Sequence, residues 1–159
     1  MTEKTDRASA EPAVVEISRH FSAARELVFE AWSSAEHLRQ WFCPETYTVP
    51  EARVEFRVGG AFDICMRSAQ GEDHWTRGRF LEIVHPARLV IEMSPGAGKG
   101  AALFRAHTVV SFAEEAGGTR LDVVQRYTLL DPRAAPMIRG APQGWRETLD
   151  RLERVVARS

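Results

Sequence analysis

The feature that most constrains the fold is a succession of strand-like segments from Tyr47 to Leu129, with no amphipathic helical pattern among them. Apolar residues alternate with charged ones at residues 53–58, and the same period of two returns at residues 62–66. Gly59-Gly60 and Gln70-Gly71 are typical of the turns between such strands. A parallel sheet needs crossover helices, which this succession lacks, so we expect a mostly antiparallel sheet.

Six to seven strands are expected, because one more strand precedes this succession. A glycine-rich connection, Gly96–Gly100, separates the fifth strand from the sixth. The expected strands are residues 14–21, 47–58, 62–66, 74–84, 89–93, 104–114 and 119–129.

Two short helices are expected between the first strand and the second. Ser22 can cap the first of them. Ser33 and Glu36 have the S-x-x-E spacing of a capping box, which predicts the start of the second. Pro44 should end that helix, because proline has no amide hydrogen to donate.

One long helix is expected at the C-terminal end of the chain. Pro136 and Pro142 interrupt the approach to it, so the firm helix should begin near Gln143. Its apolar stripe consists of Trp145, Leu149, Leu152 and Val156. A twisted sheet has a concave apolar face, and this helix is the element that can cover it. The sequence therefore predicts an α+β fold in which a curved sheet wraps around the C-terminal helix and encloses an apolar, ligand-sized cavity.

The length and composition favour a single domain. A chain of 159 residues with 44% hydrophobic content can build a core without disulfides or metals. Residues 1–12 lack apolar periodicity and are expected to form a disordered tail, so the domain should span residues 13–159. Lysine plus arginine (21) nearly balances aspartate plus glutamate (22), which argues against nucleic acid as a partner.

The sequence predicts a cytoplasmic protein. The polar N-terminus has no apolar segment of the kind that a secretory signal needs, and no later stretch approaches the length of a membrane span. Cys43 and Cys65 form no spaced ligand cluster and are expected to be free buried thiols.

Several short motifs, in their order and spacing, resemble one known family. The chain is similar to the START-like (SRPBCC, helix-grip) superfamily, and within it to the AHSA type, homologues of the activator of a heat-shock chaperone's ATPase. The resemblance implies the helix-grip fold and a hydrophobic ligand pocket over residues 14–156. Cys43 and Pro142 depart from the pattern. The motifs are residues 21–29 with Ala31-Trp32, Trp41–Pro44, Arg57–Gly60, Gly78–Phe80 and Gly144-Trp145.

No motif for phosphate, metal or nucleophilic catalysis is convincing. The Gly96–Gly100 segment leads into a strand rather than a helix, so it predicts a mobile hairpin loop that could serve as a lid over the cavity, rather than a phosphate loop. The five histidines show no metal-ligand spacing, and no nucleophile motif is present. We therefore expect no metal, no cofactor and no assigned catalytic residue.

Polar residues within apolar strands are candidates for orienting a ligand, if they face the cavity. Trp75, His107, Gln125 and Arg77 are the candidates; the alternative for each is a place at a strand end or on the solvent face, and the sequence favours that alternative for Arg77 and Gln125. The apolar wall could be formed by Met137, Trp145 and Leu149 near or on the last helix, and by strand residues. Plain core packing is the alternative for this set. The strand residues are Phe62, Ile64, Met66 and Phe80.

Three functions follow from these patterns. The leading one is binding of a hydrophobic or aromatic small molecule in the cavity. An enzyme resembling the family's cyclases or hydrolases would need an inward-facing His107, Asp63 or Glu92 to move protons. A stress-related module that docks on a chaperone is motivated by the resemblance alone. Exposed strand edges also leave room for a homodimer.

Overall fold

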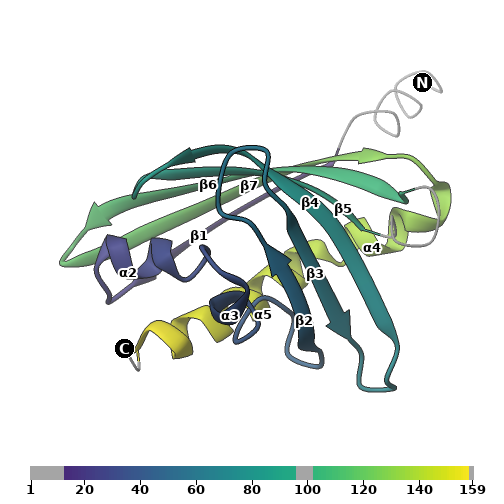
Figure 1. The fold of residues 1–159 in the computed structure, drawn as a ribbon, viewed down its shortest axis with the longest axis horizontal. Helices are drawn as coiled ribbons and strands as arrows, with labels where there is room; N and C mark the ends of the chain where they lie inside the picture. Colours follow the sequence, from purple (N-terminus) through teal and green to yellow (C-terminus); the bar gives the residue numbers. More distant parts are fainter. Residues whose placement is uncertain (1–12, 96–101, 158–159) are drawn as a thin grey trace, which may run out of the picture.

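The computed structural model describes residues 13–95 and 102–157, drawn as a coloured ribbon in Figure 1. The tail expected at residues 1–12 and the connection at Gly96–Gly100 lie outside the described residues.

One seven-stranded sheet dominates the fold, and its strands lie in the order β1-β7-β6-β5-β4-β3-β2. Every neighbouring pair is antiparallel. The predicted succession of one strand, two short helices, six strands and a final helix is confirmed. The strands are β1 (Val14–Phe21), β2 (Thr48–Val54), β3 (Phe62–Arg67), β4 (Asp73–Val84), β5 (Arg88–Pro95), β6 (Phe104–Glu115) and β7 (Gly118–Leu129).

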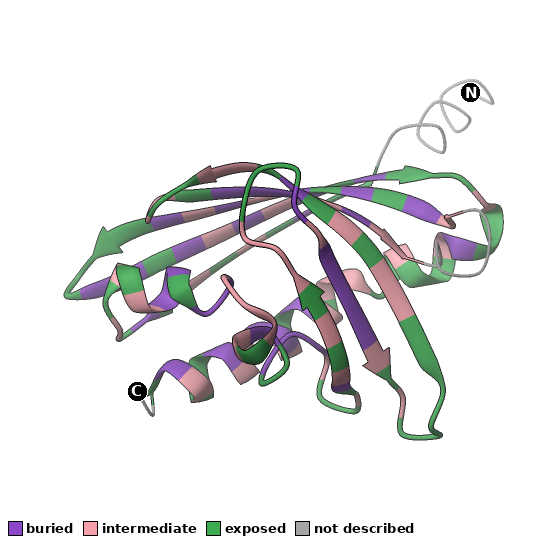
Figure 2. Cartoon of the chain, in the orientation of Figure 1, coloured by how far each residue is buried: buried purple, intermediate pink, exposed green. Residues whose placement is uncertain are grey.

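The described helices all lie on the concave face of the sheet (Figure 1). β2, β3 and part of β4 bend down around the long α5, which gives the α+β helix-grip architecture that the sequence predicts. Buried residues concentrate between the two layers (Figure 2). The helices are α2 (Arg25–Glu30), α3 (Ala35–Leu38), the short 3-10 helix η2 (Pro132–Ala134), α4 (Ala135–Arg139) and α5 (Ala141–Ala157).

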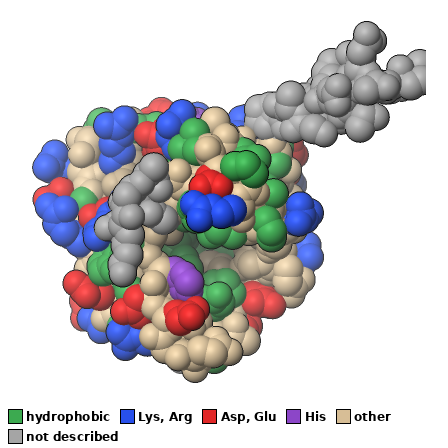
Figure 3. All heavy atoms as spheres, turned by 90° about the vertical axis from the view of Figure 1, so that its right-hand side faces the viewer, with side chains coloured by type: hydrophobic (Ala, Val, Ile, Leu, Met, Phe, Trp, Pro, Cys, Tyr) green, Lys and Arg blue, Asp and Glu red, His purple; other side chains and the backbone are tan. Residues whose placement is uncertain are grey.

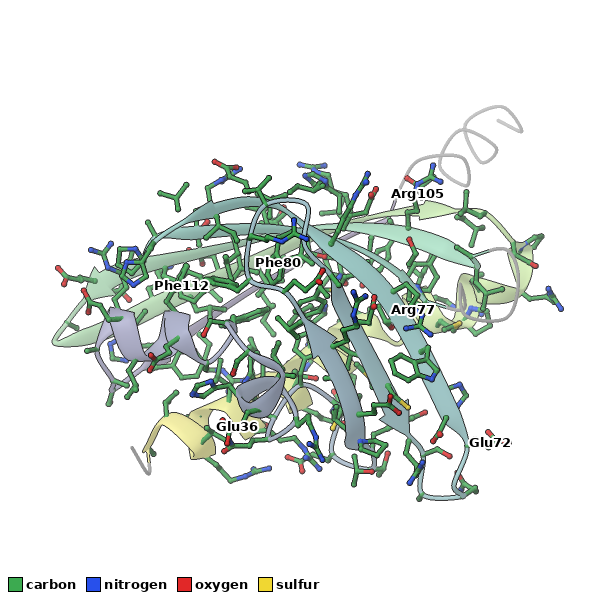
Figure 4. All side chains as sticks on the ribbon, in the orientation of Figure 1. Glu36, Glu72, Arg77, Phe80, Arg105 and Phe112 are labelled. Atoms are coloured by element: carbon green, nitrogen blue, oxygen red, sulfur yellow. The ribbon has the colours of Figure 1, made fainter. Side chains whose placement is uncertain are left out.

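Strand residues alternate between the core and the solvent, as the pleat of a sheet requires. On β6, Phe104, Ala106 and Phe112 are buried against the helices, while Arg105 between them is exposed. Figure 4 shows Phe80 and Phe112 between the sheet and the helices, and Arg105 on the outer side. The concave face therefore supplies the core.

Gly117 and Ala116 form the two-residue turn between β6 and β7, and both have positive φ angles, 79° and 51°. This geometry matches the twist of the flanking strands. Gly118, the first residue of β7, is needed for another reason: a Cβ there would lie 2.1 Å from the carbonyl oxygen of Phe21. Gly117 thus lies in the turn, whereas Gly118 lies in the strand.

The helix starts differ from the sequence-based expectation. Ser34, not Ser33, caps α3: its hydroxyl accepts a hydrogen bond from the His37 amide at 3.1 Å. Ser33 instead donates to the carbonyl of Glu30, at 2.7 Å. The cap therefore lies one residue later than the capping-box spacing predicts, because either serine can accept a backbone hydrogen bond and the spacing does not decide between them.

Three further element boundaries were wrong. α2 begins at Arg25 after Ala24, whose side chain cannot cap it, rather than at Ser22. α3 ends at Leu38, well before Pro44. α5 begins at Ala141 rather than near Gln143, because proline is tolerated in the first turn of a helix, where no amide donor is needed.

A substitution of Leu149 tests how far the stability of the core depends on α5. It is completely buried on the inward side of the helix. We expect Leu149→Ala to lower the free energy of unfolding by about 2–5 kcal/mol, since it removes apolar contacts and leaves a cavity. The measurement is urea unfolding followed by circular dichroism.

Leu130→Ala is the matched control, because Leu130 is 44% exposed. It should change the free energy of unfolding by no more than about 1 kcal/mol. Equal effects of the two variants would contradict the placement of α5 against the sheet.

Candidate functional site

Gln125 is a polar residue in the middle of the buried face of β7. Its side chain is only 4% exposed. It lies opposite Val15 of β1 on one side and Thr108 of β6 on the other. A primary amide in such a position must find hydrogen-bond partners, because burying it without them is costly.

Gln125 finds those partners on two strands and on α5. Its Oε1 accepts hydrogen bonds from the Trp145 indole Nε1, at 2.8 Å, and from the Tyr127 hydroxyl. Its Nε2 donates to the Thr108 hydroxyl at 2.8 Å, and Met93 Sδ lies 3.8 Å from the same nitrogen. We call Thr108, Gln125, Tyr127 and Trp145 the Gln125 cluster.

The Gln125 cluster carries no charge. Burial raises the pKa of the Tyr127 hydroxyl well above its ordinary value, and the hydrogen bond with Trp145 lowers it only in part. Tyr127 therefore stays protonated and acts as a donor at physiological pH. The four members of the Gln125 cluster hold one another in place by hydrogen bonding, and they offer no acid or base for proton transfer near neutral pH.

Aromatic residues surround the cluster on the helical side. The rings of Trp32 and Trp145 are stacked, with centroids 6.4 Å apart. Phe42 packs edge-on against Trp145 at 5.9 Å and against Phe62 at 5.4 Å. The Trp41 Nε1 donates to the Ala31 carbonyl at 3.0 Å. The Trp32 Nε1, in contrast, is buried and has no acceptor among the described residues.

The end of the fold near α4 exposes apolar side chains. Leu129, Leu130 and Met137 are 44–48% exposed there. Figure 3 looks onto this end and shows a hollow with hydrophobic side chains in it. Behind Leu129, its pairing partner Phe104 packs against Tyr127 with ring centroids 5.4 Å apart. Apolar surface thus leads from this rim toward the Gln125 cluster.

The structure brings two of the sequence-predicted site residues, Gln125 and Trp145, into direct contact. Met66 is half-buried on the concave face, and Met137 is 46% exposed at the rim. The other four on this side are completely buried core residues, so they form the floor and walls of the interior rather than an open surface. They are Phe62, Ile64, Phe80 and Leu149.

Trp75 and His107 do not face the interior, which corrects the expectation that they could orient a ligand there. Trp75 lies on the convex face under Arg77, whose guanidinium carbon is 4.2 Å from the ring centroid. His107 is exposed between Glu92 and Arg126 of the neighbouring strands. The physical reason is strand alternation: Thr108 occupies the buried side, so its neighbour His107 must point outward.

Asp63 and Glu92 also lie on the convex side. Asp63 accepts a hydrogen bond from the Gly78 amide at 3.2 Å and pairs with Arg53 and Arg77 at 3.5 and 3.6 Å. Glu92 pairs with Arg79 at 3.4 Å. An enzyme of the expected kind needs Asp63, Glu92 or His107 to face the interior and move protons. All three side chains lie on the convex side, so this alternative has no support from them.

Tyr127, Thr108 and Trp32 were missed as candidates. Tyr127 stands two residues after Gln125, so strand alternation places it on the same face, and this signal was available in the sequence. Thr108 could have been found in the same way from Phe104 and Phe112. No local pattern reports the contact of Trp32 with Trp145, because it joins residues far apart in the chain.

A separate surface hollow of about 490 Å³ lies beside α2, away from the Gln125 cluster. It is lined by Leu27, Phe29, Phe56 and His85, with Glu26 and Glu30 among its polar residues. Over residues 13–95 and 102–157, no group of histidine, cysteine or carboxylate side chains is arranged to hold a metal ion. None of the described helices combines the length and the apolar character required to cross a bilayer.

Comparisons with known proteins agree with this architecture. The family model described as Activator of Hsp90 ATPase homolog 1-like protein matches residues 22–157. A solved Rhizobium leguminosarum protein is 32% identical, covers 94% of this chain and 97% of its own, and superposes with a TM-score of 0.78. A Chromobacterium violaceum protein is 25% identical, with coverage of 90% and 96% and a TM-score of 0.79.

A Silicibacter pomeroyi protein described as AHSA1 is 22% identical and shows the same fold, with a TM-score of 0.75 over 91% of this chain and 98% of its own. A search of curated proteins gives no match.

Gln125→Leu tests the Gln125 cluster. The substitution leaves the Tyr127 hydroxyl and the Trp145 N–H buried without their acceptor, and each such group costs about 1–3 kcal/mol. We expect the free energy of unfolding to fall by at least about 2 kcal/mol. Urea unfolding monitored by tryptophan fluorescence measures the change.

Gln143→Leu is the control, because Gln143 is exposed on α5. It should change the free energy of unfolding by no more than about 0.5 kcal/mol. If the two leucine variants are equally stable, the hydrogen bonds of the cluster do not form in solution.

Proposed function

Because the chain belongs to the family of Activator of Hsp90 ATPase homolog 1-like proteins, whose model covers residues 22–157, we propose that it binds a hydrophobic small molecule between the curved sheet and α5. The fold is that of the START-like (SRPBCC) superfamily, a fold that suggests a ligand-binding domain. The observation that carries the proposal is the neutral Gln125 cluster, buried in an apolar interior behind an exposed apolar rim.

Small-molecule sites in proteins usually have this composition. They are lined mostly by apolar and aromatic side chains, and a few polar groups orient the ligand. Here Trp145, Phe104 and Met93 supply apolar surface next to the polar atoms of Gln125 and Tyr127. The arrangement suits an aromatic or otherwise hydrophobic molecule with one polar end.

The segment at the rim can open at low cost. α4 contains no buried residue, so moving it away from the sheet sacrifices little apolar burial. It is followed directly by Gly140 and then by α5, which carries Trp145. A ligand would enter past Met137, pass Phe104 and reach the Gln125 cluster.

Native mass spectrometry of the purified protein, combined with a thermal-shift screen of hydrophobic metabolites, tests the proposal. We expect a bound small molecule in a one-to-one complex, or compounds that raise the melting temperature in a saturable way, because a ligand stabilises the state that it binds. A protein that carries no ligand and responds to no compound would contradict the proposal.

Met137→Asp locates the binding site. A carboxylate at the rim should weaken the binding of any hydrophobic hit at least about fivefold, because the ligand then loses apolar contact beside a hydrated charge. Isothermal titration calorimetry measures the affinity.

Val84→Asp is the matched control, since Val84 is 45% exposed, nearly as much as Met137, but lies at the end of β4 beside the turn to β5. The Val84→Asp variant should bind the same compound with the affinity of the unmodified protein. Equal loss of binding in both variants would place the site elsewhere.

A further inference from the structure

From the polar groups of the interior, and resting on the proposed function, we infer that this site selects a neutral ligand that carries a hydrogen-bond acceptor, such as a ketone, and discriminates against carboxylates. The acceptor is bound by the indole N–H of Trp32, on the aromatic layer beside the Gln125 cluster. The inference depends on three features: the arginines of β4, β6 and β7 point outward, the Gln125 cluster is already satisfied, and the Trp32 N–H is a buried donor without an acceptor among the described residues.

The arginines of β4, β6 and β7 near the Gln125 cluster point away from the interior. Arg77, Arg105 and Arg126 are exposed, and each occupies the strand position next to an inward-facing residue. The Gln125 cluster itself contains only neutral groups. A carboxylate placed beside it would be buried without a counter-charge, which is far more costly than burying a neutral carbonyl group. The raised pKa of Tyr127 has the same cause, since burial there disfavours an anion.

The hydrogen-bonding capacity of the Gln125 amide is already used. Its oxygen accepts from Tyr127 and Trp145, and its nitrogen donates to Thr108 with Met93 Sδ nearby. A ligand that bound through this amide would have to break an existing hydrogen bond. The net gain from such an exchange would be small.

The Trp32 N–H is different, because it is a buried donor without an acceptor among the residues that the structure describes. Buried donors are nearly always paired, so an unpaired one needs an explanation, such as a bound molecule. Trp32 stacks on Trp145, which donates to Gln125, so it lies directly beside the cluster. An acceptor placed here gains a hydrogen bond and breaks none.

Three probes of nearly equal shape test the selectivity on the full chain: acetylnaphthalene, ethylnaphthalene and naphthoate. They present a ketone, a hydrocarbon and a carboxylate at the same position of one ring system. We expect the ketone to bind about two- to tenfold more tightly than the hydrocarbon, the range of one net hydrogen bond. The carboxylate should bind at least about tenfold more weakly than the ketone. Calorimetry or fluorescence titration gives the dissociation constants.

Trp32→Phe and Trp41→Phe form a matched pair of variants. Both residues are completely buried tryptophans, but only Trp41 already donates to a backbone carbonyl. Trp32→Phe should abolish the preference for the ketone over the hydrocarbon, while Trp41→Phe should keep it. Without ligand, Trp41→Phe should have the lower melting temperature, because it removes a hydrogen bond that is made.

The outcomes separate this inference from the proposed function. If the carboxylate binds as tightly as the ketone, or the ketone no better than the hydrocarbon, the selectivity is wrong while the binding function stands. A ketone preference that survives Trp32→Phe overturns the assignment of the donor. If none of the three probes binds, this inference fails, while the proposed function is decided separately by the metabolite screen. The comparison of the three probes on the unmodified protein tests the selectivity even if a variant does not fold.

Discussion

The burial of one face of the sheet is the interaction on which the rest of the domain depends. Successive residues of a strand point to opposite faces, so every second residue of the long central strands enters the core. The described helices all cover the concave face (Figure 1), and apolar burial on that side is therefore the main source of stability. α5 closes the core with Trp145 and Leu149, and the aromatic residues around Trp32 fill the space beside it.

The polar groups of the interior follow from the same burial. A glutamine on the covered face is tolerated because Tyr127, Thr108 and Trp145 use its amide completely. On the same two strands, Arg105 and Arg126 occupy alternate positions that point outward. The Gln125 cluster therefore makes the interior polar at one place without a charge. This neutrality determines which molecules can bind there.

The sequence was sufficient for the order of elements and for the antiparallel sheet, because hydrophobic period and glycine turns are local signals. It was not sufficient for the site. The facing of His107 follows only from its whole strand, because Phe104 and Phe112 on either side place Thr108 on the buried face and His107 therefore on the other. The contact between Gln125 and Trp145 joins a strand to a helix, and no local pattern reports such a pairing. The capping serine was also ambiguous, because Ser33 and Ser34 offer the same hydroxyl.

The position of β1 has a consequence for how the chain folds. β2 to β7 follow one another as neighbouring hairpins, but β1 pairs with β7, so that Val14 lies opposite Arg126. β1 also contacts α5, where Arg19 pairs with Asp150 at 2.8 Å. Pairings between distant residues form slowly, because a long loop must close before they contribute. During synthesis the hairpins can form as the chain emerges, whereas the first strand must wait for the last helix before the core is closed.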